Sequence, residues 1–337
     1  MTEEELEESL SAPTPDTVVA LARLSGDIAI LGAGGKMGPS LARLAVRASA
    51  AAGVPRRVIA VSRFSDQSVR EVIERAGIET ISCDLFDRSA VDRLPDVAHV
   101  LSLAGRKFGT STDPAATWAT NTYLPALVAE RFAESRIVAF STGNVYPLSP
   151  APGPGPDEDA PLGPVGEYAT AAAAREQVLT FFCQRNATPM AFLRINYAIE
   201  PRYGVLRDIA DAVRSGEAID LGAAFVNVIW QRDANSIALR VLERCAVPPF
   251  IVNVTRSPAV AVRDIADGLA RRFGTHAKFG RSEGSMALLS DASRCARIFG
   301  DPPVRLEEMI DRVADWVMAG GRSLGRPTHF AERGGQF

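Results

Sequence analysis

Short apolar runs alternate with longer stretches of helical periodicity over the first two thirds of the chain. The runs at 27–31, 57–61, 79–83, 97–103, 136–140 and 190–195 have the length of buried strands. The intervening segments predict helices at 37–52, 65–76, 114–134 and 167–184. Strands separated by helices indicate repeated βαβ units, and hence an α/β protein with a Rossmann-type, doubly wound parallel sheet.

The rest of the chain divides by composition. Residues 1–25 are interpreted as an N-terminal extension with a helix at 16–24, and residues 26–195 as the Rossmann domain, which contains a proline-rich loop at 147–164. The irregular pattern after 196 favours a smaller C-terminal α/β lobe over 196–325, from which the apolar run 250–254 returns to the sheet. Two interpretations of the tail, 326–337, stay open: it folds back over a cleft or a subunit contact, or it is disordered.

Composition narrows the class of protein. The chain has 337 residues, a net charge of −3 and 47% hydrophobic residues, which is typical of a soluble globular protein and argues against nucleic acid as a partner. Its four cysteines and three histidines are widely spaced, which argues against a metal site and favours a reducing compartment. The acidic N-terminus lacks the order of a signal peptide, and no apolar run reaches ~18 residues, so we expect a cytoplasmic protein without a membrane span.

A glycine-rich segment directly follows the first predicted strand and opens the first helix. Gly32, Gly35 and Gly38 have the spacing G-x-x-G-x-x-G. Such glycines allow a tight turn and a close approach of the backbone to a pyrophosphate at the helix N-terminus. The segment therefore predicts a dinucleotide site, with Met37 in the loop and Lys36 either near the phosphates or facing solvent.

The end of the second strand bears on the choice of coenzyme. In an NAD site an acidic residue here binds the ribose hydroxyls, but this chain has Ser62 and Arg63, with no carboxylate before Asp66. A hydroxyl and a guanidinium would bind a 2′-phosphate, so NADP is favoured. If Arg63 is only a solvated surface residue, NAD remains open.

Several segments together resemble one family. Cys83-Asp84-Leu85, Leu103-Ala104-Gly105, Asn121 and Phe140-Ser-Thr142-Gly-Asn144-Val-Tyr146 are similar to motifs of the extended short-chain dehydrogenase/reductases, the NAD-dependent epimerase/dehydratase family. The resemblance implies that the following residues line the coenzyme: Asp84 and Leu85 at the adenine, then Leu103, Ala104, Gly105 and Asn121.

The resemblance also implies the catalytic residues, with one departure. Thr142 takes the place of the family's catalytic serine or threonine, and Tyr168 opens the Tyr-x-x-x-Lys signature, contacting the coenzyme as well. The lysine of that signature is Ala172 here. A phenol with a pKa near ~10 is a poor base at neutral pH without a neighbouring cation. Lys107 is our hypothetical substitute, and Arg175, two helical turns after Tyr168, is the poorer one.

On the substrate side the pattern is weaker, and the family's arginine that clamps a sugar-nucleotide diphosphate has no clear counterpart. The substrate-binding candidates are Asn144, Asn196, Arg202, Trp230 and Arg232. Asn196 could equally satisfy backbone groups at a strand end, Trp230 could be core, and Arg232 could pair near Asp233.

Two functions follow from these residues. The first is an NAD(P)-dependent oxidoreductase or epimerase that acts by hydride transfer on a secondary hydroxyl or carbonyl of a sugar or sugar-acid-like molecule. The second is a non-catalytic NAD(P)-binding regulator that lost the lysine; redox-neutral dehydration is a third option. The family resemblance also implies a homodimer that pairs through the helices at 114–134 and 167–184.

Overall fold

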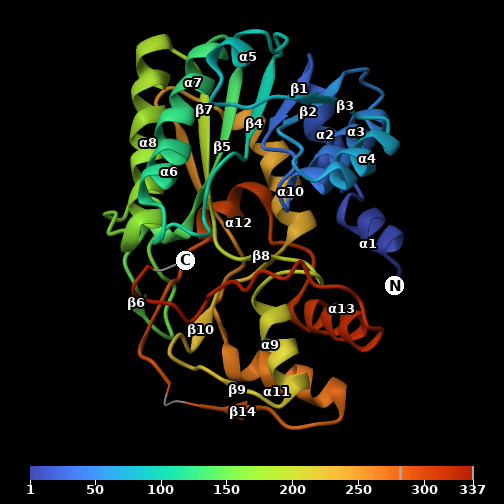
Figure 1. The fold of residues 1–337 in the computed structure, drawn as a ribbon, viewed down its shortest axis with the longest axis vertical. Helices are drawn as coiled ribbons and strands as arrows, with labels where there is room; N and C mark the ends of the chain where they lie inside the picture. The colour runs from blue at the N-terminus through green and yellow to red at the C-terminus, as the bar shows by residue number, and fades with distance from the viewer. Residues whose placement is uncertain (281–282, 336–337) are drawn as a thin grey trace.

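The larger lobe is built on a seven-stranded parallel sheet (Figure 1). The computed structural model describes residues 1–280 and 283–335. The strand order is β12-β7-β5-β4-β1-β2-β3, so the order reverses between β1 and its neighbour β4. The strands are β1 (Ile28–Leu31), β2 (Val58–Ser62), β3 (Glu79–Ser82), β4 (His99–Ser102), β5 (Arg136–Thr142), β7 (Met190–Ile195) and β12 (Phe250–Val254). This architecture confirms the predicted Rossmann-type α/β fold, and β12 is the strand predicted at 250–254, paired with β7.

Helices cover both faces of the sheet, and they bury the apolar side chains that the central strands place on each face. In β1, Ile28 and Ile30 belong to one core cluster while Ala29 and Leu31 belong to another, as the alternation of side chains along a strand requires. The helices of the larger lobe are α2 (Pro15–Arg23), α3 (Gly38–Ala51), α4 (Gln67–Arg75), α5 (Arg88–Asp92), α6 (Pro114–Trp118), α7 (Leu124–Arg131), α8 (Gly166–Asn186), α10 (Gln231–Arg240) and α12 (Ser293–Phe299), with short helical turns η2 (Gly143–Val145) and η3 (Val241–Arg244).

The helix predicted at 114–134 is interrupted. A π-helical turn, η1 (Ala119–Tyr123), joins α6 to α7. Pro125 follows at the start of α7 and lacks the N–H that an uninterrupted α-helix would donate to Asn121. The turn shifts the helical phase, and it places Asn121 in the buried interior.

The smaller lobe packs three helices, α9 (Val205–Ser215), α11 (Val262–Phe273) and α13 (Leu306–Met318), around a core of their own. Short strand pairs border it: β8 (Ala198–Ile199) with β11 (Ile229–Trp230), β9 (Ala218–Ile219) with β14 (Lys278–Phe279), and β10 (Phe225–Val226) with β13 (Val260–Ala261). A further pair, β6 (Ser149–Pro150) with β15 (Met286–Ala287), joins the proline-rich loop to the segment before α12.

An unpredicted helix, α1 (Glu3–Leu10), begins the N-terminal extension. Leu6 and Leu10 are fully buried in the core of the smaller lobe, so the extension is part of the packed structure. Within the described residues, no helix combines the length and apolarity that a membrane crossing needs, and no three His, Cys, Asp or Glu side chains are grouped to hold a metal ion.

Candidate active site

A cavity of about 240 Å³ lies between the two lobes, at the carboxyl ends of the central strands. In an open α/β sheet this edge, next to the reversal of strand order, is where ligands bind. The cavity is lined by residues from the loop after β1, the ends of β4, β5 and β7, the first turns of α8 and the C-terminal tail. Its chemically functional side chains are Lys36, Lys107, Thr142, Tyr168, Arg175 and Tyr203.

The glycine loop forms a tight cradle beneath this cavity. A Cβ on Gly32, whose φ is +81°, would lie 2.8 Å from the backbone nitrogen of Ala104. A Cβ on Gly38 would lie 2.1 Å from the Ala33 carbonyl oxygen. Helix α3 begins at Gly38 after Met37, whose thioether does not cap a helix. The Gly38 N–H donates to the Gly35 carbonyl oxygen at 3.2 Å and Pro39 has no N–H, which leaves the Ser40 N–H of this turn for an anion.

Gly34 and Gly35 do not have the surroundings that the G-x-x-G-x-x-G spacing predicts for them. A Cβ on Gly34 would lie 2.8 Å from the Ser62 hydroxyl, so a side chain there would make Ser62 turn away, although the sequence spacing does not include Gly34. A Cβ on Gly35 would meet only the Gly32 carbonyl oxygen at 3.4 Å, an ordinary contact. The close packing of the loop against β2 is therefore visible only in three dimensions.

The Lys36 side chain leaves the loop and crosses towards the smaller lobe. Its Nζ donates to the Ala198 carbonyl oxygen at 2.5 Å and lies 4.2 Å from the ring centre of Tyr203. Burial lowers the pKa of Lys36 to about 7; nearby Glu200 opposes this shift, and the positive charge of Lys107 adds to it. Lys36 therefore faces the cavity and changes its charge near neutral pH.

The residues predicted to hold the adenosine half lie along the ends of β2 and β3. Ser62 is partly buried, Arg63 and Asp84 are exposed, and Leu85 is buried. The Asp66 carboxylate caps α4, accepting hydrogen bonds from the Ser68 N–H and hydroxyl. The exposed groups near the end of β2 thus comprise one guanidinium and a carboxylate already engaged with its own helix.

The segment after β4 forms another wall. Leu103 and Gly105 line the cavity, and the backbone of Ala104 packs against Gly32. Asn121 does not line the cavity, but it is fully buried behind Gly105 and its Nδ2 donates to the Arg106 and Thr117 carbonyl oxygens, each at 3.0 Å. The amide oxygen of Asn121 accepts hydrogen bonds from the Arg106 N–H at 3.3 Å and from the Arg175 Nη1 at 3.2 Å.

Thr142 and Tyr168 face the same cavity from different elements. Thr142 ends β5, and Tyr168 lies in the first turn of α8. The Thr142 hydroxyl accepts a hydrogen bond from the Asn144 N–H at 3.2 Å, and it can still donate one to a ligand. The structure therefore brings together the two hydroxyls expected at the reacting oxygen.

Ala172, predicted from the sequence to stand at the lysine of the family signature, is surrounded by apolar side chains. It is fully buried against Val145 and Tyr146. Arg175, one turn further along α8, lines the cavity, and its guanidinium lies near the Tyr168 hydroxyl. Burial lowers the pKa of Arg175, while the proximity of Tyr168 and of the neighbouring carboxylate on α8 opposes that shift. Arg175, which the sequence ranks behind Lys107, is thus a cation beside the tyrosine.

Lys107, in the segment after β4, also lines the cavity and contacts the C-terminal tail. Its Nζ lies 3.4 Å from the Thr328 carbonyl oxygen, and burial lowers its pKa to about 8, opposed by the charge of Asp208. The N–H and hydroxyl of Thr328 both donate to the Asp208 carboxylate, at 2.7 and 2.6 Å. Of the two interpretations of the tail, the structure shows the folded-back one for 326–335; residues 336–337 lie outside the described residues.

Two of the five substrate candidates line the cavity. Asn144 and Asn196 do so, although the Asn196 Nδ2 also donates to the Leu288 carbonyl oxygen at 3.2 Å. Asn196 therefore combines the two roles that the sequence left open, a cavity wall and a backbone contact.

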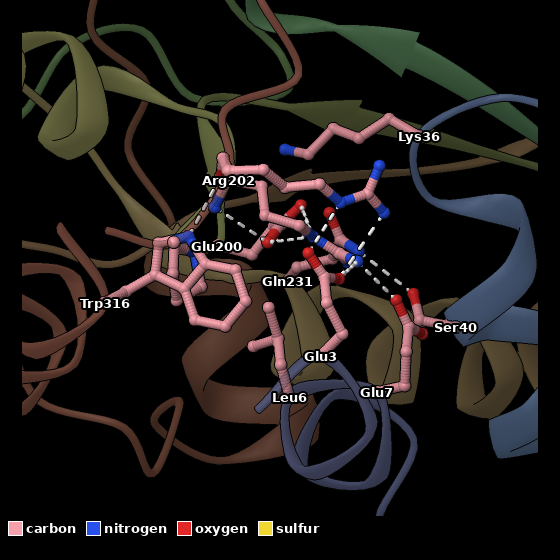
Figure 2. Close-up of polar contacts among 12 residues, drawn as sticks. Glu3, Leu6, Glu7, Lys36, Ser40, Glu200, Arg202, Gln231 and Trp316 are labelled. Atoms are coloured by element: carbon pink, nitrogen blue, oxygen red, sulfur yellow. Dashed lines mark hydrogen bonds and ion pairs between the residues drawn. The ribbon is translucent and has the colours of Figure 1, made fainter. Parts of the chain in front are cut away.

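The other three candidates are placed elsewhere, which corrects the prediction. Figure 2 shows Arg202 surrounded by carboxylates: Nε pairs with Glu200 at 3.0 Å, and Nη1 contacts Glu3 at 2.9 Å and Glu7 at 2.7 Å. Trp230 is fully buried in the core of the smaller lobe. Arg232 pairs with its chain neighbour Asp233 at 2.8 Å. Burial of the indole and neutralisation of the two guanidinium groups within the protein account for these placements.

Comparison with known proteins agrees with this geometry. The model of the NAD dependent epimerase/dehydratase family matches residues 28–244. No curated protein matches the sequence at a significant level.

Solved structures show the same fold at low sequence identity. UDP-glucose 4-epimerase of Thermus thermophilus, in complex with NAD, is 20% identical, with a TM-score of 0.70 over 86% of this chain and 98% of that chain. A variant of UDP-glucuronic acid 4-epimerase of Bacillus cereus, in complex with a fluorinated UDP-sugar and NAD, is 16% identical, with a TM-score of 0.73 over 87% and 99%. An epimerase of Methanothermobacter thermautotrophicus is 16% identical, with a TM-score of 0.74 over 91% and 96%. The family match spans more than half of the sequence, and the chain belongs to the NAD-dependent epimerase/dehydratase family.

Proposed function

We propose that the protein is an NAD(P)-dependent oxidoreductase or epimerase that acts by hydride transfer on a secondary hydroxyl or carbonyl of a sugar or sugar-acid-like substrate. The observation that carries this proposal is the convergence of Thr142, Tyr168 and Arg175 on one cavity at the carboxyl edge of the sheet, above the glycine loop. The solved epimerases that share the fold, two of them with NAD and one of these with a UDP-sugar, support it.

The glycine loop fits a dinucleotide. Side chains at Gly32 and Gly38 would clash with the backbone of Ala104 and Ala33, and the loop therefore presents bare backbone at the N-terminus of α3. These backbone groups would hold the pyrophosphate, and the end of β2 would hold the adenosine ribose. A bound nicotinamide supplies hydride acceptance and donation; the remaining tasks fall to side chains of this chain.

The two hydroxyls have distinct tasks at the substrate. Tyr168 exchanges a proton with the substrate oxygen, and Thr142 holds that oxygen by a hydrogen bond. Both face the cavity, and Tyr168 already has a cation beside it in Arg175. The pair therefore provides general acid–base chemistry at one secondary alcohol.

Lys36 and Lys107 favour an acidic substrate. Both line the small cavity, and burial lowers the pKa of each, to about 7 and about 8. An anionic group bound between them would offset their desolvation and hold them in the protonated form. We therefore favour a sugar acid over a neutral sugar, with Asn144 and Asn196 as neutral hydrogen-bonding groups on the cavity wall.

The test is a substrate panel with each coenzyme. Purified protein is mixed with NAD⁺ or NADP⁺ and with free sugars, sugar acids, UDP-glucose and UDP-glucuronic acid; reduced nicotinamide is followed by absorbance and product stereochemistry by NMR. We expect conversion of an acidic member, abolished by Tyr168→Phe but not by Tyr123→Phe, a change at an exposed surface tyrosine. Unaffected turnover in Tyr168→Phe would contradict the proposal.

A second candidate function rests on Ala172. Because the family's lysine position is filled by buried apolar packing, a regulator that binds the coenzyme without turning anything over remains the alternative. Tight binding of NAD⁺ or NADP⁺ with no product from any member of the panel would favour it.

We also propose a homodimer that pairs through α6, η1 and α8. Three large aromatic side chains on these elements are exposed: Trp118, Tyr123 and Phe181. Exposed apolar groups of this size, spread along one face from the start to the end of α8, favour a subunit interface. Sedimentation should give a dimer that Phe181→Glu dissociates; a monomeric wild-type protein would contradict the proposal.

A further inference from the structure

We propose that Arg175 is the positioning residue of this active site: its guanidinium fixes Tyr168 and donates a hydrogen bond to the bound coenzyme. The inference rests on the proposed function and deepens it. It starts from three observations: Arg175 and Tyr168 line the same cavity, Arg175 lies on the same face of α8 as that tyrosine, seven residues further along, and its Nη1 donates to Asn121.

The guanidinium is held by a rigid partner. Its Nη1 donates to the Asn121 Oδ1 at 3.2 Å. The Nδ2 of Asn121 is committed to two backbone carbonyl oxygens, so the amide cannot rotate without losing both hydrogen bonds. The π-helical turn η1 holds Asn121 at this depth, and π-turns of this kind are frequent at functional sites.

The Arg175 guanidinium passes close to the backbone of Gly105. A Cβ on Gly105 would lie 2.9 Å from the Arg175 Nη1, so a side chain at this position would displace the end of the arginine. Ala172 lies three residues before Arg175 on the same helical face, where a lysine would place two positive charges side by side. The alanine at 172 and the arginine at 175 are therefore complementary.

The charge of Arg175 is incompletely compensated within the protein. Its side chain is buried, and its Nε has no hydrogen-bond partner among residues 1–280 and 283–335. The nearest carboxylate, Glu176, is already paired with Arg194 at 2.7 Å. A buried cation with an unused donor is costly unless a ligand satisfies it. The ribose hydroxyls of a nicotinamide dinucleotide are acceptors of the required kind.

Coenzyme binding tests the inference without any substrate. Isothermal titration calorimetry with NAD⁺ and NADP⁺ compares the wild type with Arg175→Ala, Arg175→Lys and the control Arg185→Ala, an exposed arginine on the same helix. We expect Arg175→Ala to weaken binding of the preferred coenzyme by about tenfold or more, the size expected for a lost hydrogen bond to a charged group. Arg175→Lys should retain most of the affinity, and added ethylguanidine should restore binding to Arg175→Ala but leave the wild type unchanged.

The link to Tyr168 is tested by a double-mutant cycle. Because the two side chains line the same cavity from one face of α8, Tyr168→Phe combined with Arg175→Ala should weaken coenzyme binding by less than the product of the two separate effects. Independent, multiplicative effects would overturn the pairing.

The outcomes separate this inference from the function on which it rests. Wild-type affinity in Arg175→Ala overturns the inference and leaves the proposed function intact. A wild-type protein that binds neither coenzyme overturns the proposed function itself. If circular dichroism shows that Arg175→Ala does not fold, Arg175→Gln, which removes the charge but keeps a polar side chain, is judged by the same criteria.

Discussion

Arg194 and Glu176 form a buried ion pair that joins strand β7 to helix α8. The Nε of Arg194 lies 3.1 and 3.2 Å from the two carboxylate oxygens, and Nη2 lies 2.7 Å from Oε2. The two side chains are only 4% and 3% exposed. The Ser141 hydroxyl donates to the same carboxylate. Because Ser141 directly precedes Thr142 and Glu176 directly follows Arg175, this pair fixes the backbone on both sides of the active site.

Removing one member of this pair should be strongly destabilising. We expect Arg194→Met to lower the free energy of unfolding by about 3–5 kcal/mol, because Glu176 would be left buried without its counter-charge. The double variant Arg194→Met/Glu176→Leu should recover most of the loss, since it leaves no unpaired charge. Urea unfolding measures both. As a control, Arg70→Met, which breaks a surface pair with Glu74, should cost less than about 1 kcal/mol; equal losses at the two sites would contradict the argument.

Lys36 should reduce stability in the absence of ligand. Its pKa is about 7 in the folded protein, below the 10.5 of the free group, so the unfolded chain binds the extra proton between these values. The destabilisation is therefore complete below pH 7 and disappears as the pH rises towards 10.5. Lys36→Met should raise Tm by at least about 2 °C at pH 6 and by progressively less from pH 7 to pH 10. Differential scanning calorimetry across this range tests the trend, and a gain that grows with pH would refute it.

The third glycine of the loop should tolerate no side chain. A Cβ on Gly38 would lie 2.1 Å from the Ala33 carbonyl oxygen, which forces the backbone of the cradle to move. We expect Gly38→Ala to weaken binding of NAD⁺ and NADP⁺ by at least about tenfold in calorimetric titrations, roughly 1.4 kcal/mol. Gly280→Ala is the matched control, because its Cβ would meet only the Ala218 side chain at 3.4 Å. Similar affinities in the two variants would argue against a role of the loop in coenzyme binding.

Arg63 should determine any preference for the phosphorylated coenzyme. It is exposed at the end of β2, and the nearby Asp66 carboxylate is engaged in capping α4. Arg63→Ala should therefore weaken NADP⁺ binding by about tenfold and change NAD⁺ binding little, since only NADP⁺ carries the 2′-phosphate. Parallel titrations give the ratio of the two dissociation constants. A ratio that the substitution leaves unchanged would remove the basis for favouring NADP.

Arg202 should act on stability and not on ligand binding. Its guanidinium neutralises Glu200, which is only 1% exposed, and joins it to Glu3 and Glu7 of α1. Arg202→Met should cost about 3 kcal/mol or more in urea unfolding and leave coenzyme affinity within about twofold. Arg322→Met, which removes an exposed contact with Glu3, should have a small effect on both.

The central frame could be predicted because the inner strands bury both faces. In β1 and β2 the apolar runs are continuous, in β4 and β7 the polar residues within the strand are only His99, Ser102 and Arg194, and the helices between these strands are long, so local periodicity is a sufficient signal. The glycine loop, Thr142 and Tyr168 are also placed by local motifs at the ends of these strands.

The remaining features depend on contacts between distant residues. Helix α1 is mostly acidic and shows only Leu6 and Leu10 as apolar positions, so its burial depends on a core that forms from residues after 196. The sequence does not reveal that Arg202 is neutralised by α1, nor that Arg175 reaches Tyr168, since the second contact depends on Asn121 and Gly105 from other elements. Motif spacing therefore predicts the hydroxyls of Thr142 and Tyr168, but it does not predict the positive charge of Arg175 near Tyr168.

The position of β12 has a consequence for synthesis on the ribosome. Strands β7 and β12 are neighbours in the sheet, yet 54 residues (196–249) lie between them and contribute much of the smaller lobe. The edge of the sheet therefore stays open until residue 254 has left the exit tunnel, and the nascent chain must hold an exposed β7 during that interval. The two lobes consequently cannot fold as successive units during translation, because each contains segments that are made before and after part of the other.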